Sequence, residues 1–261
     1  MKNEHNPSRR NFLKQASVLG ATAVATPVAF GKIRFSEDEQ SGENYHFLFQ
    51  GDSITDGNRS RNEDLNHVLG HGYAYLIAAK LGYSLPQKNF HFSNRGVSGN
   101  QITDLVQRWP DDTIALKPDL LSIIIGVNDT MNEAGGNKNA TISGFEHNYR
   151  ALLSETMRQL PSLQLVIMEP FLLPVGKLKG DWSRYQEAIS GRQAAAKKLA
   201  DEFNAVYVPL QDKFTKAAKQ YPPETYWLWD GIHPMPNGHE LIALEWIGQV
   251  GKKLPFILTK P

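Results

Sequence analysis

The chain has 261 residues, of which 41% are hydrophobic, with 28 basic and 27 acidic side chains and a net charge of +1. This near-neutral balance gives no electrostatic reason to expect nucleic acid or an anionic membrane as a partner. The chain contains no cysteine, which excludes disulfides, thiolate catalysis and cysteine-ligated metal sites. Its length allows one large domain, or at most two, with a sizeable core.

The first residues have the features of an export signal. Ser8–Lys14 (SRRNFLK) holds two consecutive arginines and precedes the apolar stretch Ala16–Phe30, which is interrupted by Pro27. That stretch is shorter than the ~20 apolar residues that cross a bilayer as a helix. We therefore expect residues 1–31 to be a twin-arginine-type signal peptide of a bacterial protein that is periplasmic or secreted. Residues 32–44 are expected to form a polar linker. No cysteine is available for a lipid anchor.

Tyr45–Asn58 (YHFLFQGDSITDGN) is the stretch around which the rest of the chain is organised. Tyr45–Gln50 has the aromatic and apolar content of a strand covered on both faces, and Gly51 and Asp52 end it. The following turn presents Ser53 at the carboxyl end of a strand, where open α/β sheets bind their ligands. A lone serine at such a place most often caps a helix, so a catalytic interpretation needs partners from elsewhere in the chain.

Strands and helices alternate after this turn. We expect strands over Phe90–Phe92, Leu120–Ile125, Leu163–Met168 and Ala205–Val208, and helices over Gly72–Leu81, Gln101–Trp109, Ile142–Leu160, Trp182–Phe203, Asp212–Gln220 and Gly238–Lys252. Gly82 is expected to stop the first of these helices. The alternation predicts one α/β domain over residues 45–261, with helices on both faces of a five-stranded parallel sheet. Right-handed crossovers and one chain reversal predict the flavodoxin-like strand order 2-1-3-4-5.

Polar residues from several loops should meet at the carboxyl edge of this sheet. Ser53 follows the first strand, Gly99 the second and Asn128 the third, and Asp230 and His233 come just before the last helix. A neutral histidine can take the proton of a serine, and a carboxylate on its other ring nitrogen fixes its tautomer. The backbone N–H groups of Ser53 and Gly99 and the amide of Asn128 are candidate donors to a developing oxyanion.

Four short blocks resemble those of the SGNH, or GDSL, hydrolases of the bacterial esterase type. They are GDSIT at Gly51–Thr55, NRGVSGN at Asn94–Asn100, GVND at Gly126–Asp129 and DGIHP at Asp230–Pro234. The first block is not the G-x-S-x-G elbow of the α/β-hydrolases. The resemblance covers residues 45 to about 246. It implies a flavodoxin-like three-layer α/β/α sandwich and ester hydrolysis without metal or cofactor. The implied triad is Ser53, Asp230 and His233, and the implied oxyanion hole is Ser53, Gly99 and Asn128.

Several other polar and aromatic residues have simpler structural explanations. Asp129 is expected to have a structural role in its loop, for example as a cap of the next helix. Ser98 is not expected to be a second nucleophile, because no other Asp-x-x-His pair accompanies it. His67 and His71 have a metal-ligand spacing only if they are helical, and flanking glycines argue for a surface loop. Two interpretations stay open for Tyr226–Trp229: an anchor in the core, or a ring that forms a sugar-stacking wall.

These features predict a serine esterase that removes short acyl groups, above all acetyl, from extracellular carbohydrate. The loops expected around Ser53, residues 56–64 and 132–139, are polar, and only Phe171–Leu173 and Tyr226–Trp229 offer apolar surface. Such loops suit a sugar better than an acyl tail. A lysophospholipase or thioesterase acting on lipid is the alternative, and a non-catalytic glycan-binding module is the second. The expected partner is a small-molecule or polysaccharide ester, and the oligomeric state is left open.

Overall fold

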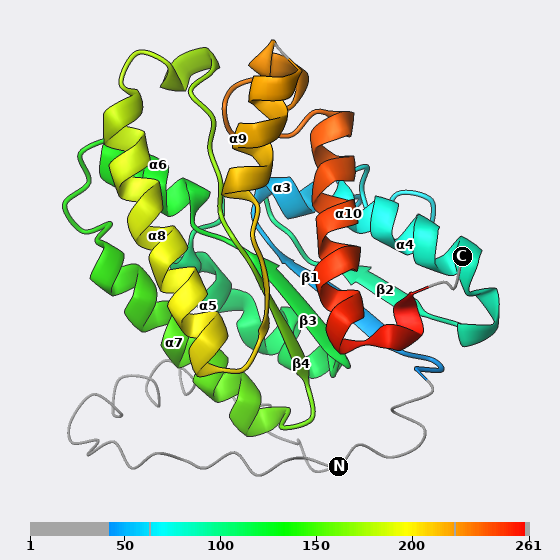
Figure 1. The fold of residues 1–261 in the computed structure, drawn as a ribbon. Coiled ribbons are helices and arrows are strands. Elements are labelled where there is room, and N and C mark those ends of the chain that lie inside the picture. The colour runs from blue at the N-terminus through cyan, green and yellow to red at the C-terminus, as the bar shows by residue number, and fades with distance from the viewer. Residues whose placement is uncertain (1–41, 63, 222, 259–261) are drawn as a thin grey trace, which may run out of the picture. The chain divides into compact units, whose positions relative to one another are not determined.

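The computed structural model describes residues 42–62, 64–221 and 223–258, and five strands in them form one sheet (Figure 1). The strands are β1 (His46–Gly51), β2 (His91–Asn94), β3 (Leu120–Ile124), β4 (Gln164–Met168) and β5 (Val206–Val208). All neighbours are parallel, in the order β2-β1-β3-β4-β5. The expected sheet and strand order are confirmed. The expected signal peptide, and the linker up to residue 41, lie outside the described residues.

Helices cover both faces of the sheet (Figure 1). They are α3 (Ser53–Asp56), α4 (Tyr73–Ser84), α5 (Ile102–Asp112), α6 (Val127–Ala134), α7 (Ile142–Gln159), α8 (Trp182–Glu202), α9 (Gln211–Gln220) and α10 (Pro236–Lys253). Alternate side chains of β1 point to opposite faces, as in any strand. Phe47 and Phe49 are buried in one core cluster with residues of α4, α9 and α10. Leu48 is buried in a second cluster with residues of α5, α7 and α8. The result is the expected three-layer α/β/α arrangement.

Two fully buried tryptophans, one in each cluster, have their indole N–H groups paired. Trp246 Nε1 donates to Ser122 Oγ at 2.9 Å, and Trp109 Nε1 donates to Thr156 Oγ1 at 2.8 Å. A buried N–H without a partner would cost about 1–3 kcal/mol, so each hydroxyl allows a large apolar ring to be buried without that cost. Each face of the sheet is therefore covered by a core whose large indole ring has its polar group paired, and these cores fix the strand ends that carry the polar loops.

The expected helix boundaries are wrong in three places, one of which is the end of α5, at Asp112 and not at Trp109. Helix α4 does not stop at Gly82 but continues to Ser84, and Pro86 follows directly after its C-cap residue. A proline disfavours helical backbone at the residue before it, and it outweighs the weak preference of a glycine for ending a helix. Asn128 and residues 132–134, expected in loops, belong to helix α6. This helix has only eight residues, and its apolar spacing consists of Val127, Met131 and Ala134 alone, which is too short a pattern to mark a helix in the sequence.

Candidate active site

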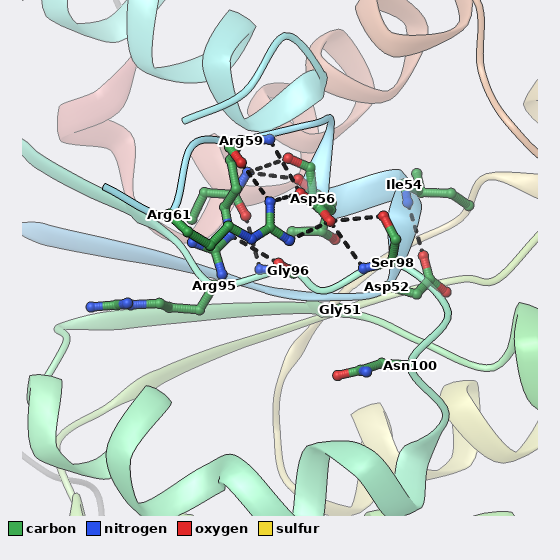
Figure 2. Close-up of polar contacts among 12 residues, drawn as sticks. Gly51, Asp52, Ile54, Asp56, Arg59, Arg61, Arg95, Gly96, Ser98 and Asn100 are labelled. Atoms are coloured by element: carbon green, nitrogen blue, oxygen red, sulfur yellow. Dashed lines mark hydrogen bonds and ion pairs between the residues drawn. The ribbon is translucent and has the colours of Figure 1, made fainter. Parts of the chain in front are cut away.

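Ser53 lies in the tight connection between β1 and the short helix α3. Gly51 has a φ of +153°, and a Cβ at this position would clash with the backbone carbonyl of Ile124. Glycine is therefore needed for β3 to approach so closely. The side chain of Asp52 caps α3, with Oδ1 accepting from the Ile54 N–H at 3.0 Å (Figure 2). These two residues turn the chain sharply and place Ser53 at the first position of the helix.

A continuous chain of polar contacts joins Ser53 to His233 and Asp230. Ser53 Oγ lies 2.9 Å from His233 Nε2, and His233 Nδ1 lies 2.9 Å from Asp230 Oδ2. The other carboxylate oxygen, Asp230 Oδ1, accepts from the backbone N–H groups of Ile232 at 3.0 Å and His233 at 2.8 Å. With a proton on Nδ1 facing Asp230, the lone pair of Nε2 faces the serine hydroxyl. The structure thus brings together three residues that are up to 180 positions apart in the sequence.

Asp230 is held as a carboxylate by its surroundings. Burial alone raises the pKa of its side chain, but the hydrogen bonds from the His233 backbone, the His233 ring and the Ile232 backbone outweigh burial. The net pKa of Asp230 lies below its usual value. A carboxylate that accepts several N–H bonds is stabilised in its charged form. Asp230 is therefore suited to orient an imidazole and to stabilise its protonated form.

The segments that carry Gly99 and Asn128 lie against the same edge of the sheet. The backbone N–H of Val97 donates to the carbonyl of Gly51 at 3.1 Å, which ties the loop after β2 to the end of β1. Asn128, in the first turn of α6, donates from Nδ2 to the carbonyl of Asn100 at 3.0 Å. Gly99 has a φ of +84°, a conformation that favours glycine, and its α-carbon faces open space. The two residues are thus held beside one another, at the carboxyl end of β1.

Two buried carboxylates flank this region. Asp129 Oδ1 accepts from the N–H of Ile102 at 3.3 Å, so it serves the amino end of α5, a helix that precedes it in the chain. Burial raises the pKa of Asp129 to about 6. Burial also raises the pKa of Asp52 to about 7, and the nearby charge of Asp129 adds to the effect. One oxygen of each carboxylate, Asp52 Oδ2 and Asp129 Oδ2, has no hydrogen-bond partner.

The segment Tyr226–Trp229 contains both a side chain that is buried in the core and aromatic rings that are exposed. Leu228 is fully buried in the core, whereas the ring of Trp229 lies stacked near that of His233, with centroids 6.2 Å apart and an angle of 21°. Trp229 is 58% exposed and Tyr226 is 49% exposed. Aromatic surface is therefore present beside His233. By contrast, Phe171–Leu173 does not provide the expected apolar loop surface, because all three side chains are buried in the core.

The remaining candidates have structural partners. Ser98 donates from Oγ to Asp56 at 2.7 Å, a contact that the sequence did not suggest. His67 lies in a non-helical segment and contacts Asp64 at 2.7 Å. Across the described ranges, no group of three or more His, Asp or Glu side chains is placed to hold a metal ion. His239 is buried, and its Nδ1 accepts a hydrogen bond from the Tyr73 N–H at 3.2 Å, so its role is structural.

Comparison with known proteins identifies the family. The model of the GDSL-like Lipase/Acylhydrolase family matches residues 49–241. The chain belongs to this family. Among curated proteins, this GDSL hydrolase is similar to an acetylxylan esterase from Geobacillus stearothermophilus, 32% identical over 216 residues that cover 80% of this chain and 95% of that protein.

Solved structures agree with this assignment. A GDSL-like protein from Parabacteroides merdae is 37% identical, with a TM-score of 0.76 over 80% of this chain and 96% of that one. A catalytic mutant of Axe2, an acetylxylan esterase from Geobacillus stearothermophilus, is 29% identical, with a TM-score of 0.73 over 84% and 99% of the two chains. The GDSL hydrolase is accordingly a carboxylic ester hydrolase, as expected from the sequence. In the part of the chain that the structure describes, no helix has the length and apolar character needed to cross a membrane.

Proposed function

We propose that this GDSL hydrolase is a serine esterase that removes acetyl groups from extracellular carbohydrate, with Ser53, His233 and Asp230 as its catalytic triad. The observation that carries the proposal is the unbroken contact path from Ser53 Oγ through both nitrogens of His233 to Asp230. It supplies a nucleophile, a base and an orienting carboxylate in the geometry that acyl transfer needs.

Each half of the reaction uses the same histidine. Ser53 Oγ attacks the carbonyl carbon of the ester while His233 Nε2 takes the hydroxyl proton. The tetrahedral intermediate collapses, the sugar oxygen leaves with that proton, and an acetyl group remains on Ser53. Water then attacks the acetyl carbonyl, His233 again takes the proton, and acetate leaves as Ser53 recovers its hydrogen. Asp230 stays ionised throughout and stabilises the positively charged imidazole.

The negative charge that develops on the carbonyl oxygen needs donors that are fixed before the reaction. We assign this role to the backbone N–H groups of Ser53 and Gly99 and to the side-chain amide of Asn128. Support comes from the placement of both partner segments against the end of β1 and from the contact of Asn128 with Asn100. The open space over the α-carbon of Gly99 leaves its backbone accessible to a substrate.

Relatives support both the triad and the acetyl substrate. Solved structures of the acetylxylan esterase Axe2 that are described as catalytic mutants replace one serine, one aspartate or one histidine. The aspartate and the histidine of that enzyme are three positions apart, as Asp230 and His233 are here. We therefore propose acetylated xylan or a similar polysaccharide as substrate. Export fits a polymeric substrate, and the twin-arginine pattern at Ser8–Lys14 supports it.

The test combines covalent labelling with substrate turnover. A fluorophosphonate probe should label the wild-type enzyme at Ser53, as read by peptide mass spectrometry, and Ser53→Ala should lose both the label and the release of acetate from acetylated xylo-oligosaccharides. Ser98→Ala is the matched control, since it removes the other serine near the site, and it should still be labelled at Ser53. Label at a different residue, or acetate release by a folded Ser53→Ala, would overturn the assignment.

A further inference from the structure

A buried carboxylate links the helix that begins at Ser53 to the loop that presents Gly99. Asp56, at the end of α3, is 2% exposed. Its Oδ2 accepts from Ser98 Oγ at 2.7 Å and from the backbone N–H of Ser98 at 3.0 Å. Figure 2 shows both contacts as dashed lines that converge on Asp56 from the Ser98 loop. No sequence motif singled out this residue.

The same carboxylate is held from its other side by two arginines. Arg61 donates from Nη1 to Oδ1 at 2.8 Å and from Nη2 to Oδ2 at 2.6 Å, and the backbone N–H of Arg59 donates to Oδ1 at 3.1 Å. Burial raises the pKa of Asp56, but the bonds from Arg61 and Ser98 outweigh it, so the pKa lies below its usual value. An ionised acceptor makes shorter and stronger hydrogen bonds than a neutral one. Asp56 is thus a rigid anionic anchor.

The loop contacts α3 at further points. Asn94 Nδ2 donates to the carbonyl of Thr55 at 2.6 Å, and the Gly96 N–H donates to Asn94 Oδ1 at 2.9 Å. Gly96 packs so closely on α3 that a Cβ there would clash with the backbone nitrogen of Asp56. Arg59 Nε donates to the Gly96 carbonyl at 2.9 Å. These contacts hold the start of the loop, whereas the two bonds to Asp56 hold Ser98, directly before Gly99.

We propose that Asp56 is a positioning residue that acts through Ser98 to set the place of the Gly99 N–H relative to Ser53. The proposal rests on the proposed esterase function, in which that N–H binds the developing oxyanion. The path is short: Ser53 and Asp56 share one helical turn, Asp56 binds Ser98, and Ser98 precedes Gly99. Donors to an oxyanion must be held within about 0.5 Å of their productive position. A fixed link between nucleophile and donor meets that demand better than two separately mobile loops.

The test compares variants that break the link with one that does not. Asp56→Ala removes both carboxylate oxygens, so neither the hydroxyl nor the backbone N–H of Ser98 keeps its acceptor. We expect kcat with p-nitrophenyl acetate to fall about 10²-fold with KM within about 2-fold, because only the transition state uses the oxyanion donor. Arg61→Ala removes the outer ion pair and leaves the bonds to Ser98, so kcat should stay within about 3-fold of wild type.

Ser98→Ala keeps the proposal testable if Asp56→Ala does not fold. It removes one hydroxyl and leaves the backbone bond, so its kcat should fall less than that of Asp56→Ala. In the double variant Asp56→Ala/Ser98→Ala, the two decreases in kcat should not multiply, because both substitutions remove the same contact between Asp56 and Ser98. The optimum pH of kcat should not move in any variant, since His233 is untouched. Unchanged kcat in both single variants, or an equal loss in Arg61→Ala, would overturn the role.

Hydrogen–deuterium exchange separates this proposal from the proposed function. Peptides over residues 94–101 should exchange faster in Asp56→Ala than in wild type, and no faster in Arg61→Ala. This measurement needs no substrate. If the wild-type protein cleaves no ester, the proposed function fails while the exchange rates still decide whether Asp56 fixes the loop. If the exchange of residues 94–101 is the same in wild type and Asp56→Ala, the link is refuted whatever the esterase activity.

Discussion

The side-chain amide of Asn128 donates a hydrogen bond to the backbone carbonyl of Asn100 across 3.0 Å. An amide NH₂ group has two hydrogens, so this bond fixes the side chain and leaves the second hydrogen for another acceptor. Asn128 lies in the first turn of helix α6, which follows β3, whereas Asn100 lies in the loop that follows β2. Their contact therefore orients one proposed oxyanion donor by means of the loop that carries the other.

Replacing Asn128 with alanine should lower kcat by ~10²–10³ with little change in KM. The amide is worth most when charge has developed on the carbonyl oxygen, so its loss affects the transition state more than the bound substrate. Steady-state kinetics with p-nitrophenyl acetate measure both constants. Asn132→Ala, one turn further along α6, is the matched control and should behave like wild type. A large rise in KM at constant kcat would instead assign Asn128 to substrate binding.

Replacing Asp230 with asparagine should lower kcat by about 10²–10⁴ while the fold is kept. If the amide nitrogen takes the place of Oδ2, it donates to His233 Nδ1 and moves the ring proton to Nε2, facing Ser53. If the amide turns the other way, its NH₂ group meets the two backbone N–H donors that Oδ1 now accepts. In either orientation, His233 is no longer held as the base that takes the proton of Ser53.

The comparison variant for this experiment is Asp181→Asn, which changes an exposed aspartate and should retain full activity. Circular dichroism checks that each variant is folded. An Asp230→Asn enzyme with wild-type kcat between pH 6 and 9 would show that the carboxylate is not needed to orient His233.

The sequence predicted the sheet well because its three central strands, β1, β3 and β4, are short and almost fully buried apolar runs. It also placed Ser53, Asp230 and His233 on loops that the structure brings into contact, because the carboxyl ends of parallel strands meet at one edge. The catalytic and oxyanion roles of these residues stay predictions. The strand order followed from the general handedness of crossovers, without any knowledge of individual contacts.

What the sequence did not reveal depends on tertiary contacts. Asp56 has no pattern of its own, and its role as an anchor arises only when Ser98 and Arg61 converge on it. The burial of Phe171–Leu173 was missed because an apolar run after a strand can line a pocket or fill a core equally well. Helix α6 was missed because it is only eight residues long, and neither its three apolar residues nor helix propensity gives a strong signal over that length.

Replacing Asp52 with asparagine should stabilise the protein at neutral pH and have little effect in acid. The pKa of Asp52 rises from 3.8 to about 7 in the folded protein, so the folded state binds a proton that the unfolded state has lost between these values. The stabilisation that Asp52 contributes is fully present below pH 4 and is lost as the pH rises through 7. Over this range the free energy of unfolding falls by at most about 1.4 kcal/mol per pH unit. Asparagine cannot ionise and still caps α3.

Urea unfolding at pH 5 and pH 8, followed by tryptophan fluorescence, measures this effect. The free energy of unfolding of Asp52→Asn relative to wild type should increase from the lower to the higher pH. The exposed Asp181→Asn again provides the control and should show no such trend. A difference between Asp52→Asn and wild type that is independent of pH would mean that Asp52 is ionised in the folded protein throughout this range.

The choice between carbohydrate and lipid substrates depends on where apolar surface lies relative to Ser53. Phe171–Leu173, the expected apolar loop, is buried in the core. A cavity of about 550 Å³ lined by Tyr45, Leu163 and Phe256 among others lies at the amino ends of the strands. Ser53 follows the carboxyl end of β1, and six residues of strand span roughly 20 Å. An acyl chain attached at Ser53 therefore starts at the far end of the sheet from this cavity.

We accordingly expect kcat/KM to fall from C2 to C8 in a series of p-nitrophenyl esters. A lipid hydrolase would gain ~0.8 kcal/mol for each CH₂ group that it buries, which is about a fourfold rise per carbon in favourable cases. We expect no such gain at Ser53, because a longer chain there would meet the polar loops and the ring of Trp229 beside His233. The series must stay below the concentrations at which the longer esters form micelles, so that the rates report on dissolved substrate. A steady rise from C2 to C8 would contradict the carbohydrate proposal and favour a lipid acyl hydrolase, and the Ser53→Ala enzyme run in parallel shows that the rates belong to this site.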